Sequence, residues 1–287
     1  MKISDILLNN RRKISFEVFP PKSDASFESV REATQEIASL SPSFMSVTYG
    51  AGGGTSKYTL DIAKNINEKY SVPSLAHLTC ISSTRETVKS RIEDMRASGI
   101  SNVMALRGDI PRGMENMPRE YKYAAELVSE LRAYGDEFCI GGACYPESHP
   151  ESKSPEEDIG FLREKVNCGL DFLTTQMFFD NSLYYAFLDR AGGVGINIPI
   201  IPGIMPVTSA SQIDRIISLS GSFLPKSFTD LVDRYGSSPE DMKKAGIDYA
   251  VRQARDLFKH GVENVHIYTM NKPDVARKIL EGVSDIL

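Results

Sequence analysis

Short apolar runs alternate with amphipathic segments along almost the whole chain. Eight runs are rich in β-branched and aromatic residues, and they span Ile14–Phe19, Phe44–Tyr49, Ser74–Cys80, Asn102–Arg107, Cys139–Tyr145, Phe172–Phe179, Ile198–Ile204 and Asn264–Met270. Strands that are buried on both faces lose the apolar–polar alternation of a half-exposed sheet and become nearly continuous apolar runs. We therefore predict that the eight runs are the strands of a buried parallel sheet.

The segments between these runs have the apolar spacing of helices. They cover Phe27–Leu40, Thr59–Tyr70, Thr84–Ser98, Tyr121–Ala133, Pro155–Asn167, Ser182–Ala191 and Ser211–Leu219. Helix boundary signals support them: Ser154 and Pro155 have the residue types of an N-cap and a first helical position. Gly99, Gly169 and Gly261 follow helical segments, where glycine commonly ends a helix.

Eight strand–helix units predict an α/β protein with a (β/α)8 TIM barrel, in one domain over residues 1–287. About sixty residues lie between the seventh and eighth runs, against roughly thirty for a plain unit. This stretch contains two further helical segments, Lys226–Tyr235 and Pro239–Lys259. We interpret them as extra helices inserted between strands 7 and 8 of the barrel.

Composition narrows the class of protein. Hydrophobic residues make up 41% of the chain and charged residues 25%, and the formal net charge is −5. These values are ordinary for a globular protein, and the negative charge argues against a nucleic-acid binder. No apolar stretch is long enough to span a membrane, and the apolar run at the N-terminus is too short for a signal peptide. We expect a cytoplasmic protein that binds neither nucleic acid nor membrane.

Several common cofactor and metal motifs do not occur in the sequence. The four cysteines form no CxxC pair and the histidines have no HExxH spacing, so we expect no metal site. A GxGxxG fingerprint, a GxxxxGK[ST] loop and a GxSxG elbow are also missing from the sequence. A nicotinamide or flavin, if bound, is therefore not held by a Rossmann-type loop.

Two carboxylates lie where the chemistry of a parallel barrel is found, at the C-terminal ends of the strands. Glu17 interrupts an apolar run; burial disfavours its charged form and suits it to donate a proton, although a salt-bridged structural carboxylate fits equally well. Asp109 follows Arg107 and Gly108, and glycine there lets the backbone approach a ligand closely. An aspartate that caps a turn is the alternative for Asp109.

Six strand-end segments carry a resemblance to a known family. They are SFEVFPPK (Ser15–Lys22), SVTYGA (Ser46–Ala51), AHLTC (Ala76–Cys80), ALRGD (Ala105–Asp109), YPESHPE (Tyr145–Glu151) and TQMFFD (Thr175–Asp180). Each is weak alone, but in this order and spacing the set resembles the methylenetetrahydrofolate reductases, in their bacterial form that consists of the catalytic domain only. The resemblance extends from about residue 13 to residue 272.

The resemblance implies a TIM barrel with noncovalent FAD. The reaction would be ping-pong: NADH or NADPH reduces the flavin, and the flavin then reduces 5,10-methylenetetrahydrofolate to 5-methyltetrahydrofolate for one-carbon metabolism and methionine biosynthesis. Glu17 matches the family's general acid, which assists opening of the five-membered ring to an iminium ion. Asp109 matches a carboxylate beside the flavin and folate, where its charge can stabilise that cation.

The resemblance also implies ligand contacts. The flavin-contacting positions are Thr48, Tyr49, Ala51, His77, Arg107, Gly108, Asp109, Tyr145, His149, Asp158 and Lys165. The folate-contacting positions are Gln176, Gln212 and Lys272. Lys272 replaces an arginine, so it can attract a glutamate carboxylate but lacks the bidentate fork.

Three substitutions depart from the family pattern. Phe161 and Glu164 lie on the helix that borders the adenosine end of the flavin, where relatives tend to have a polar and a basic residue. Ile216 stands where some relatives have a phenylalanine that touches nicotinamide and folate. These changes bear on the choice of flavin and leave open an electron-donating partner subunit in place of NADH or NADPH.

Two other functions compete with the reductase. One is a proline-dehydrogenase-like flavin barrel that oxidises a secondary amine, and the other is a non-catalytic flavin- or folate-binding subunit of a larger complex. The Arg-Gly-Asp segment with Glu17 favours the reductase over the first, and retention of Glu17, Asp109 and Gln176 favours it over the second. The apolar outer helices would also allow a homo-oligomer.

Overall fold

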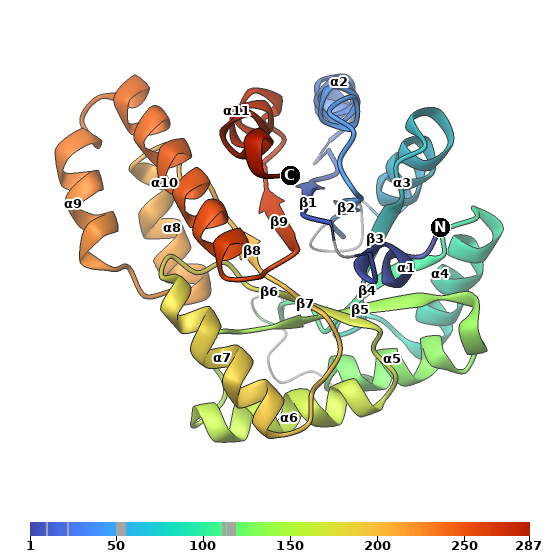
Figure 1. The fold of residues 1–287 in the computed structure, drawn as a ribbon. Coiled ribbons are helices and arrows are strands. Elements are labelled where there is room, and N and C mark those ends of the chain that lie inside the picture. The colour runs from blue at the N-terminus through green and yellow to red at the C-terminus, as the bar shows by residue number, and fades with distance from the viewer. Residues whose placement is uncertain (10, 22, 50–55, 111–112, 114–118) are drawn as a thin grey trace.

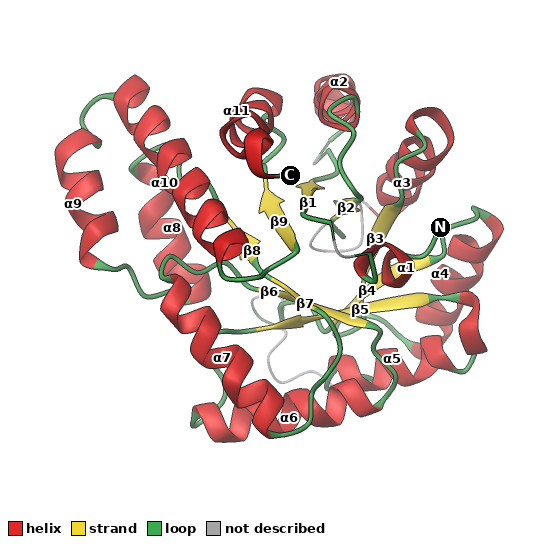
Figure 2. Ribbon diagram, viewed as in Figure 1, coloured by secondary structure: helices red, strands yellow, loops and turns green. Residues whose placement is uncertain are grey.

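A computed structural model describes the chain except residues 10, 22, 50–55, 111–112 and 114–118. In the described residues nine parallel strands form one curved sheet with helices around its outside (Figures 1 and 2). The strands are β1 (Lys13–Val18), β2 (Met45–Val47), β3 (Ser74–Thr79), β4 (Asn102–Leu106), β5 (Cys139–Cys144), β6 (Phe172–Thr175), β7 (Ile200–Ile201), β8 (Gly203–Ile204) and β9 (Asn264–Tyr268). The predicted TIM-barrel class is confirmed.

The barrel closes through a strand that is interrupted in the middle. β7 pairs with β6, whereas β8 pairs with β9, so both belong to the predicted seventh strand. Pro202 separates them, and proline has no N–H to give to a strand ladder. The Gly203 N–H donates instead to the Thr175 hydroxyl at 2.9 Å, and the Pro202 carbonyl accepts from His266 N at 2.9 Å. A side chain thus replaces one backbone partner at this point of the barrel.

The helices follow the predicted segments closely. They are α1 (Ile3–Leu7), α2 (Phe27–Ala38), α3 (Ser56–Tyr70), α4 (Arg85–Ala97), α5 (Ala124–Arg132), α6 (Pro155–Asn167), α7 (Asn181–Gly193), α8 (Ser211–Ser220), α9 (Lys226–Tyr235), α10 (Pro239–Lys259) and α11 (Pro273–Val283). Ser154 caps α6 by accepting the Glu157 N–H, as its sequence predicts. Helices α9 and α10 confirm the insertion between the seventh and eighth barrel strands. No helix in the described part of the chain is long and apolar enough to cross a membrane.

Two helices were not predicted. The N-terminal apolar run is too short for a signal peptide, and in the structure Ile3 and Leu7 of α1 pack in one cluster with Phe44 and Phe172 at the N-terminal end of the barrel. The Ile3 N–H donates to the Asn102 side-chain oxygen at 2.8 Å, which satisfies a free N–H of the first helical turn. Helix α1 therefore closes the bottom of the barrel, while α11 completes the eighth strand–helix unit.

The sixth predicted strand was too long, because the chain leaves the sheet after Thr175. Phe178 and Phe179 stay buried, yet their carbonyl groups bond to helix α10 instead of a neighbouring strand. The Phe178 carbonyl accepts from Gln253 at 2.9 Å, and the Phe179 carbonyl accepts from the Tyr249 hydroxyl at 2.5 Å. The apolar run therefore continues past the strand because the inserted helix α10 buries it.

Candidate active site

Glu17 lies near the C-terminal end of β1, inside the barrel mouth. Its side chain is 9% exposed. Its Oε2 atom accepts a hydrogen bond from the Ser46 hydroxyl at 3.2 Å and lies 3.5 Å from His77 Nε2. No lysine or arginine in the described part of the chain forms an ion pair with it. The alternative of a structural carboxylate held by a cationic side chain therefore gains no support.

His77 lies on β3, which is separated from β1 by β2, and it faces the same carboxylate. Burial lowers the pKa of His77, which outweighs the opposing effect of Glu17, and His266 lowers it further. A neutral ring is the result, and its buried Nε2 has no partner with hydrogen-bond geometry in the described structure. Since buried polar atoms are nearly always satisfied, this nitrogen is available to a ligand in the barrel mouth.

The fourth strand end places Arg107, Gly108 and Asp109 on the rim. Gly108 has φ +83°, and a Cβ there would lie 3.0 Å from the Thr79 Cβ, so both the backbone conformation and the space favour glycine. Arg107 donates two hydrogen bonds to Glu151, at 2.6 and 2.7 Å, and this pairing raises its pKa. Asp109 is exposed and does not form that ion pair.

The fifth strand end brings an aromatic pair next to Arg107. The rings of Tyr145 and His149 meet edge to face, with centroids 4.7 Å apart. Burial raises the pKa of Tyr145 to about 12 and lowers that of His149. His149 Nδ1 accepts the Glu151 N–H at 3.1 Å, so the hydrogen of a neutral ring is on Nε2.

Helix α6 supplies two further charged side chains, Lys165 and Asp158. Lys165 Nζ donates to the Ala143 carbonyl of β5 at 2.6 Å, and burial lowers the pKa of this lysine. Asp158 accepts from the Ser152 hydroxyl at 2.8 Å. Each is held by a neighbouring loop or strand, so both side chains have fixed positions on the side of the mouth formed by β5 and α6.

The three predicted folate residues come from different rim loops. Gln212 and Lys272 meet at Thr208: the Gln212 Oε1 accepts the Thr208 N–H at 2.7 Å, and Lys272 Nζ donates to the Thr208 hydroxyl at 2.6 Å. Burial lowers the pKa of Lys272, and the nearby Lys243 adds to the effect. Gln176 follows β6, and its Oε1 accepts the N–H of Met177 at 3.0 Å.

The remaining predicted flavin residues follow β2. The Thr48 N–H donates to the Val18 carbonyl at 3.1 Å, which ties this loop to the end of β1. Tyr49 is half-buried and packs against the core. Ala51 lies outside the described residues.

The three departures from the family pattern have different environments. Phe161 is 55% exposed, and Glu164 is exposed on the same helix, α6. Ile216 is 4% exposed and packs with Phe179 and Phe228 under helices α8 and α9. Phe161 and Glu164 can therefore meet a ligand or partner at the surface, whereas Ile216 is part of a core.

Three polar residues that sequence analysis did not single out complete the surroundings of Glu17. Ser15, Ser46 and His266 are 1%, 0% and 2% exposed, and hydrogen bonds connect them to one another and to Glu17. A signal was present, because each interrupts an apolar strand run just as Glu17 does. His266 lies inside the last run and not at its end, so it does not stand out as a strand-end histidine.

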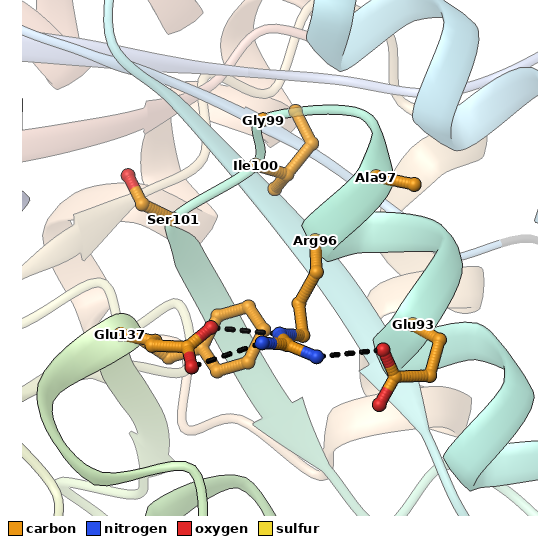
Figure 3. A pocket seen from close by; sticks show the side chains of 8 residues that line it. Glu93, Arg96, Ala97, Gly99, Ile100, Ser101 and Glu137 are labelled. Atoms are coloured by element: carbon orange, nitrogen blue, oxygen red, sulfur yellow. Dashed lines mark hydrogen bonds and ion pairs between the residues drawn. The ribbon is translucent and has the colours of Figure 1, made fainter.

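A surface pocket at the other end of the barrel has a different character. It lies beside residues that precede β4 and β5, namely Ser101 and Phe138, and therefore at the N-terminal ends of the strands. Figure 3 shows Arg96 held between Glu93 and Glu137, with hydrogen bonds of 2.7 to 3.0 Å. Its guanidinium is thus already paired, and the pocket contains none of the predicted site residues.

The sequence comparisons with known proteins agree on one family. The family model for methylenetetrahydrofolate reductase matches residues 2–284. A 5,10-methylenetetrahydrofolate reductase of Pectobacterium carotovorum is 37% identical over 274 residues, covering 95% of this chain and 90% of that protein. The enzyme of that name from Escherichia coli is 35% identical, covering 93% and 88%.

Plant and structural relatives extend the comparison. A protein of Arabidopsis thaliana named methylenetetrahydrofolate reductase (NADH) 1 is 33% identical over 97% of this chain, which spans 49% of that longer protein. A solved structure from Clostridium thermocellum, described as binding two copies of 5-methyl-5,6,7,8-tetrahydrofolic acid, superposes with a TM-score of 0.64. It covers 99% of this chain and 98% of its own, but at 14% identity it supports the fold alone.

Proposed function

The chain belongs to the methylenetetrahydrofolate reductase family, and we propose that it reduces 5,10-methylenetetrahydrofolate by ping-pong hydride transfer through noncovalent FAD. The observation that carries the proposal is the environment of Glu17. It is a buried carboxylate at the barrel mouth, held by a serine hydroxyl and unpaired with lysine or arginine among the described residues. Such a group can exchange a proton with a substrate without first breaking a salt bridge.

We propose that Glu17 is the acid of the folate half-reaction. It transfers a proton to the nitrogen that leaves the methylene carbon, and that carbon–nitrogen bond breaks to give an iminium ion. Asp109 supplies negative charge at the rim, where it stabilises this cation. His77 is neutral, so it does not compete with Glu17 for the role of acid near pH 7.

The residues around the mouth fit a flavin. The unpartnered His77 Nε2 offers a polar contact, and Gly108 allows the chain to approach a ring closely. Arg107 and Lys165 supply positive charge for a diphosphate, although Arg107 would share or exchange its Glu151 contact. Bound FAD supplies hydride chemistry, accepting a hydride from the donor and delivering one to the folate.

We assign folate recognition to the side of the mouth formed by the loops that follow β6, β8 and β9. Gln176 can donate and accept hydrogen bonds, as pterin recognition requires. Gln212 and Lys272 are held together through Thr208, and the lysine offers its charge to a glutamate carboxylate of the substrate. A small-molecule folate is therefore the proposed partner of this side.

For the electron donor we propose a reduced nicotinamide, which is supported by the plant relatives that carry NADH in their names. The test is an absorption spectrum of the purified protein, followed by anaerobic addition of NADH or NADPH. We expect a flavin spectrum that bleaches. A bound flavin that is not bleached by either would transfer the role of donor to a partner subunit, and failure to bind FAD after reconstitution would contradict the cofactor assignment.

A further inference from the structure

A chain of hydrogen bonds runs from the barrel interior to Glu17. His266 Nδ1 lies 2.7 Å from the Ser15 hydroxyl, and His266 Nε2 lies 3.0 Å from the Ser46 hydroxyl. The Ser46 hydroxyl in turn lies 3.2 Å from Glu17 Oε2. The sheet register explains this alignment, because Ser15 lies beside His266 across β1 and β9, and Glu17 lies beside Ser46 across β1 and β2.

The number of hydrogens in this series of hydrogen bonds decides which group donates and which accepts. The Ser46 hydroxyl has one hydrogen, so it can donate either to Glu17 or to His266 Nε2, but not to both. Donation to a carboxylate is the stronger bond. When Ser46 donates to Glu17, His266 must carry its hydrogen on Nε2 to bond Ser46. The hydrogen of Ser15 then faces Nδ1, or faces the Val265 carbonyl at 3.4 Å if Nδ1 is also protonated.

We infer that His266 and Ser46 are positioning residues for Glu17. The inference rests on the proposed role of Glu17 as the acid. In this arrangement Glu17 Oε2 is always the acceptor, and the proton that is transferred to the substrate is carried by Oε1. A proton on Oε2 would instead turn the Ser46 hydrogen toward His266 Nε2, which requires the other tautomer of His266, with its hydrogen on Nδ1.

The other groups around Glu17 do not take over this role. His77 Nε2 lies 3.5 Å from Oε2 but without hydrogen-bond geometry. The Tyr268 hydroxyl donates to the Thr175 carbonyl and so is turned to another strand. The His266 ring is held in plane by Phe44, which stacks on it with centroids 5.5 Å apart and 10° between the rings. No residue in the described part of the chain donates to Oε1, which agrees with its role as the oxygen that faces the substrate.

The position of the hydrogen on His266 can be measured directly. The chain has four histidines, so nitrogen-15 labelling of histidine gives a spectrum in which His266→Phe identifies the His266 signals. Nitrogen–proton correlation across the ring then shows which nitrogen carries hydrogen. We expect hydrogen on Nε2. Hydrogen on Nδ1 alone would overturn the inference, because Ser46 would then donate to His266 and not to Glu17.

The rates of the two half-reactions provide a second test, which uses several variants and so does not depend on whether His266→Phe folds. We expect Ser46→Ala to slow reoxidation of the reduced flavin by the folate roughly 10- to 100-fold, the range for a hydrogen bond to a charged group. The alkaline limb of its pH profile moves up by about one pH unit, because the carboxylate loses a donor. Smaller effects in the same direction are expected for His266→Phe, and the smallest for Ser15→Ala.

Control experiments distinguish a positioning role of Ser46 from a purely structural role, and they distinguish failure of this inference from failure of the proposed function. Ser43→Ala removes a nearby hydroxyl that donates to the Ile14 carbonyl, and it should change neither the rate nor the pH limb. If Ser46→Ala lowers both half-reactions equally without moving the limb, Ser46 is structural and the inference fails. If the wild-type protein does not reduce the folate at all, the proposed function fails, whereas an unaffected Ser46→Ala variant refutes the inference alone.

Discussion

Replacing Glu17 with glutamine is the perturbation that isolates its proton. Glutamine has nearly the same shape, and its side-chain oxygen can still accept the Ser46 hydroxyl that lies 3.2 Å from Oε2. The packing of this buried side chain should therefore survive. What disappears is the acidic hydrogen, so the variant tests proton donation and not structure.

The expected loss follows from the surroundings. General acid help contributes about 10²- to 10⁴-fold to a rate, which corresponds to about 3 to 5 kcal/mol of barrier. The nearest alternative proton carrier is His77, at 3.5 Å from Oε2, and burial lowers its pKa so that it is neutral near pH 7. His77 therefore cannot replace Glu17 as a proton donor. We expect the rate of the folate half-reaction in Glu17→Gln to decrease by a factor near the larger end of that range.

The assay is anaerobic rapid mixing, with flavin absorbance recorded separately for each half-reaction. Reduction of the flavin by its donor should stay within a few-fold of wild type, while reoxidation by methylenetetrahydrofolate should nearly stop. Glu137→Gln, at the opposite end of the barrel beside Arg96, is the matched control and should alter neither. Wild-type reoxidation in Glu17→Gln would refute the assignment of the acid, and an equal loss of both steps would indicate damage to the site.

Three further predictions concern stability and binding. Ile3→Ala removes a fully buried side chain from the α1 plug and should lower the free energy of unfolding by about 2 to 5 kcal/mol, measured as a lower denaturant midpoint with an unchanged m-value. Lys272→Met should raise the KM for the folate by roughly fivefold, equal to about 1 kcal/mol, while Lys226→Met on exposed α9 should not; an unchanged KM would remove Lys272 from the substrate site. Because burial lowers the pKa of His77 from 6.5, the unfolded chain binds a proton below that pH that the folded chain does not, so the folded state loses stability as the pH falls. His77→Phe should flatten this acid-side loss in denaturant titrations at several pH values, and an equally steep loss would contradict the pKa direction.

The strands and outer helices could be predicted because local patterns decide them. The bounds of α6, α9 and α10 coincide with the predicted segments, where proline, serine and apolar spacing mark the ends. The plug helix α1 could not be predicted this way, since five residues give too little periodicity. Its helical form depends on Asn102 and on the core at the barrel end, which are distant in sequence.

The site residues also divide into those that the sequence indicates locally and those that only the fold brings together. Glu17 stood out because a carboxylate in an apolar strand run requires an explanation. The partners of Glu17 were harder to find, because a lone serine or histidine inside a strand is common and only the register of β9, β1 and β2 brings Ser15, Ser46 and His266 together. Arg107 was expected among the flavin contacts, but its bidentate contact with Glu151 depends on the fold of the loop after β5. The single domain, the cytoplasmic location and a homo-oligomer stay predictions.

The central claim is that this barrel passes a hydride from a flavin to methylenetetrahydrofolate. The most direct measurement is an anaerobic single turnover, in which the protein with reduced FAD is mixed with 5,10-methylenetetrahydrofolate and both flavin and product are quantified. We predict that the flavin is reoxidised and that 5-methyltetrahydrofolate forms in an amount equal to the flavin. Flavin that stays reduced in the presence of the folate, or reoxidation without 5-methyltetrahydrofolate, would contradict the account.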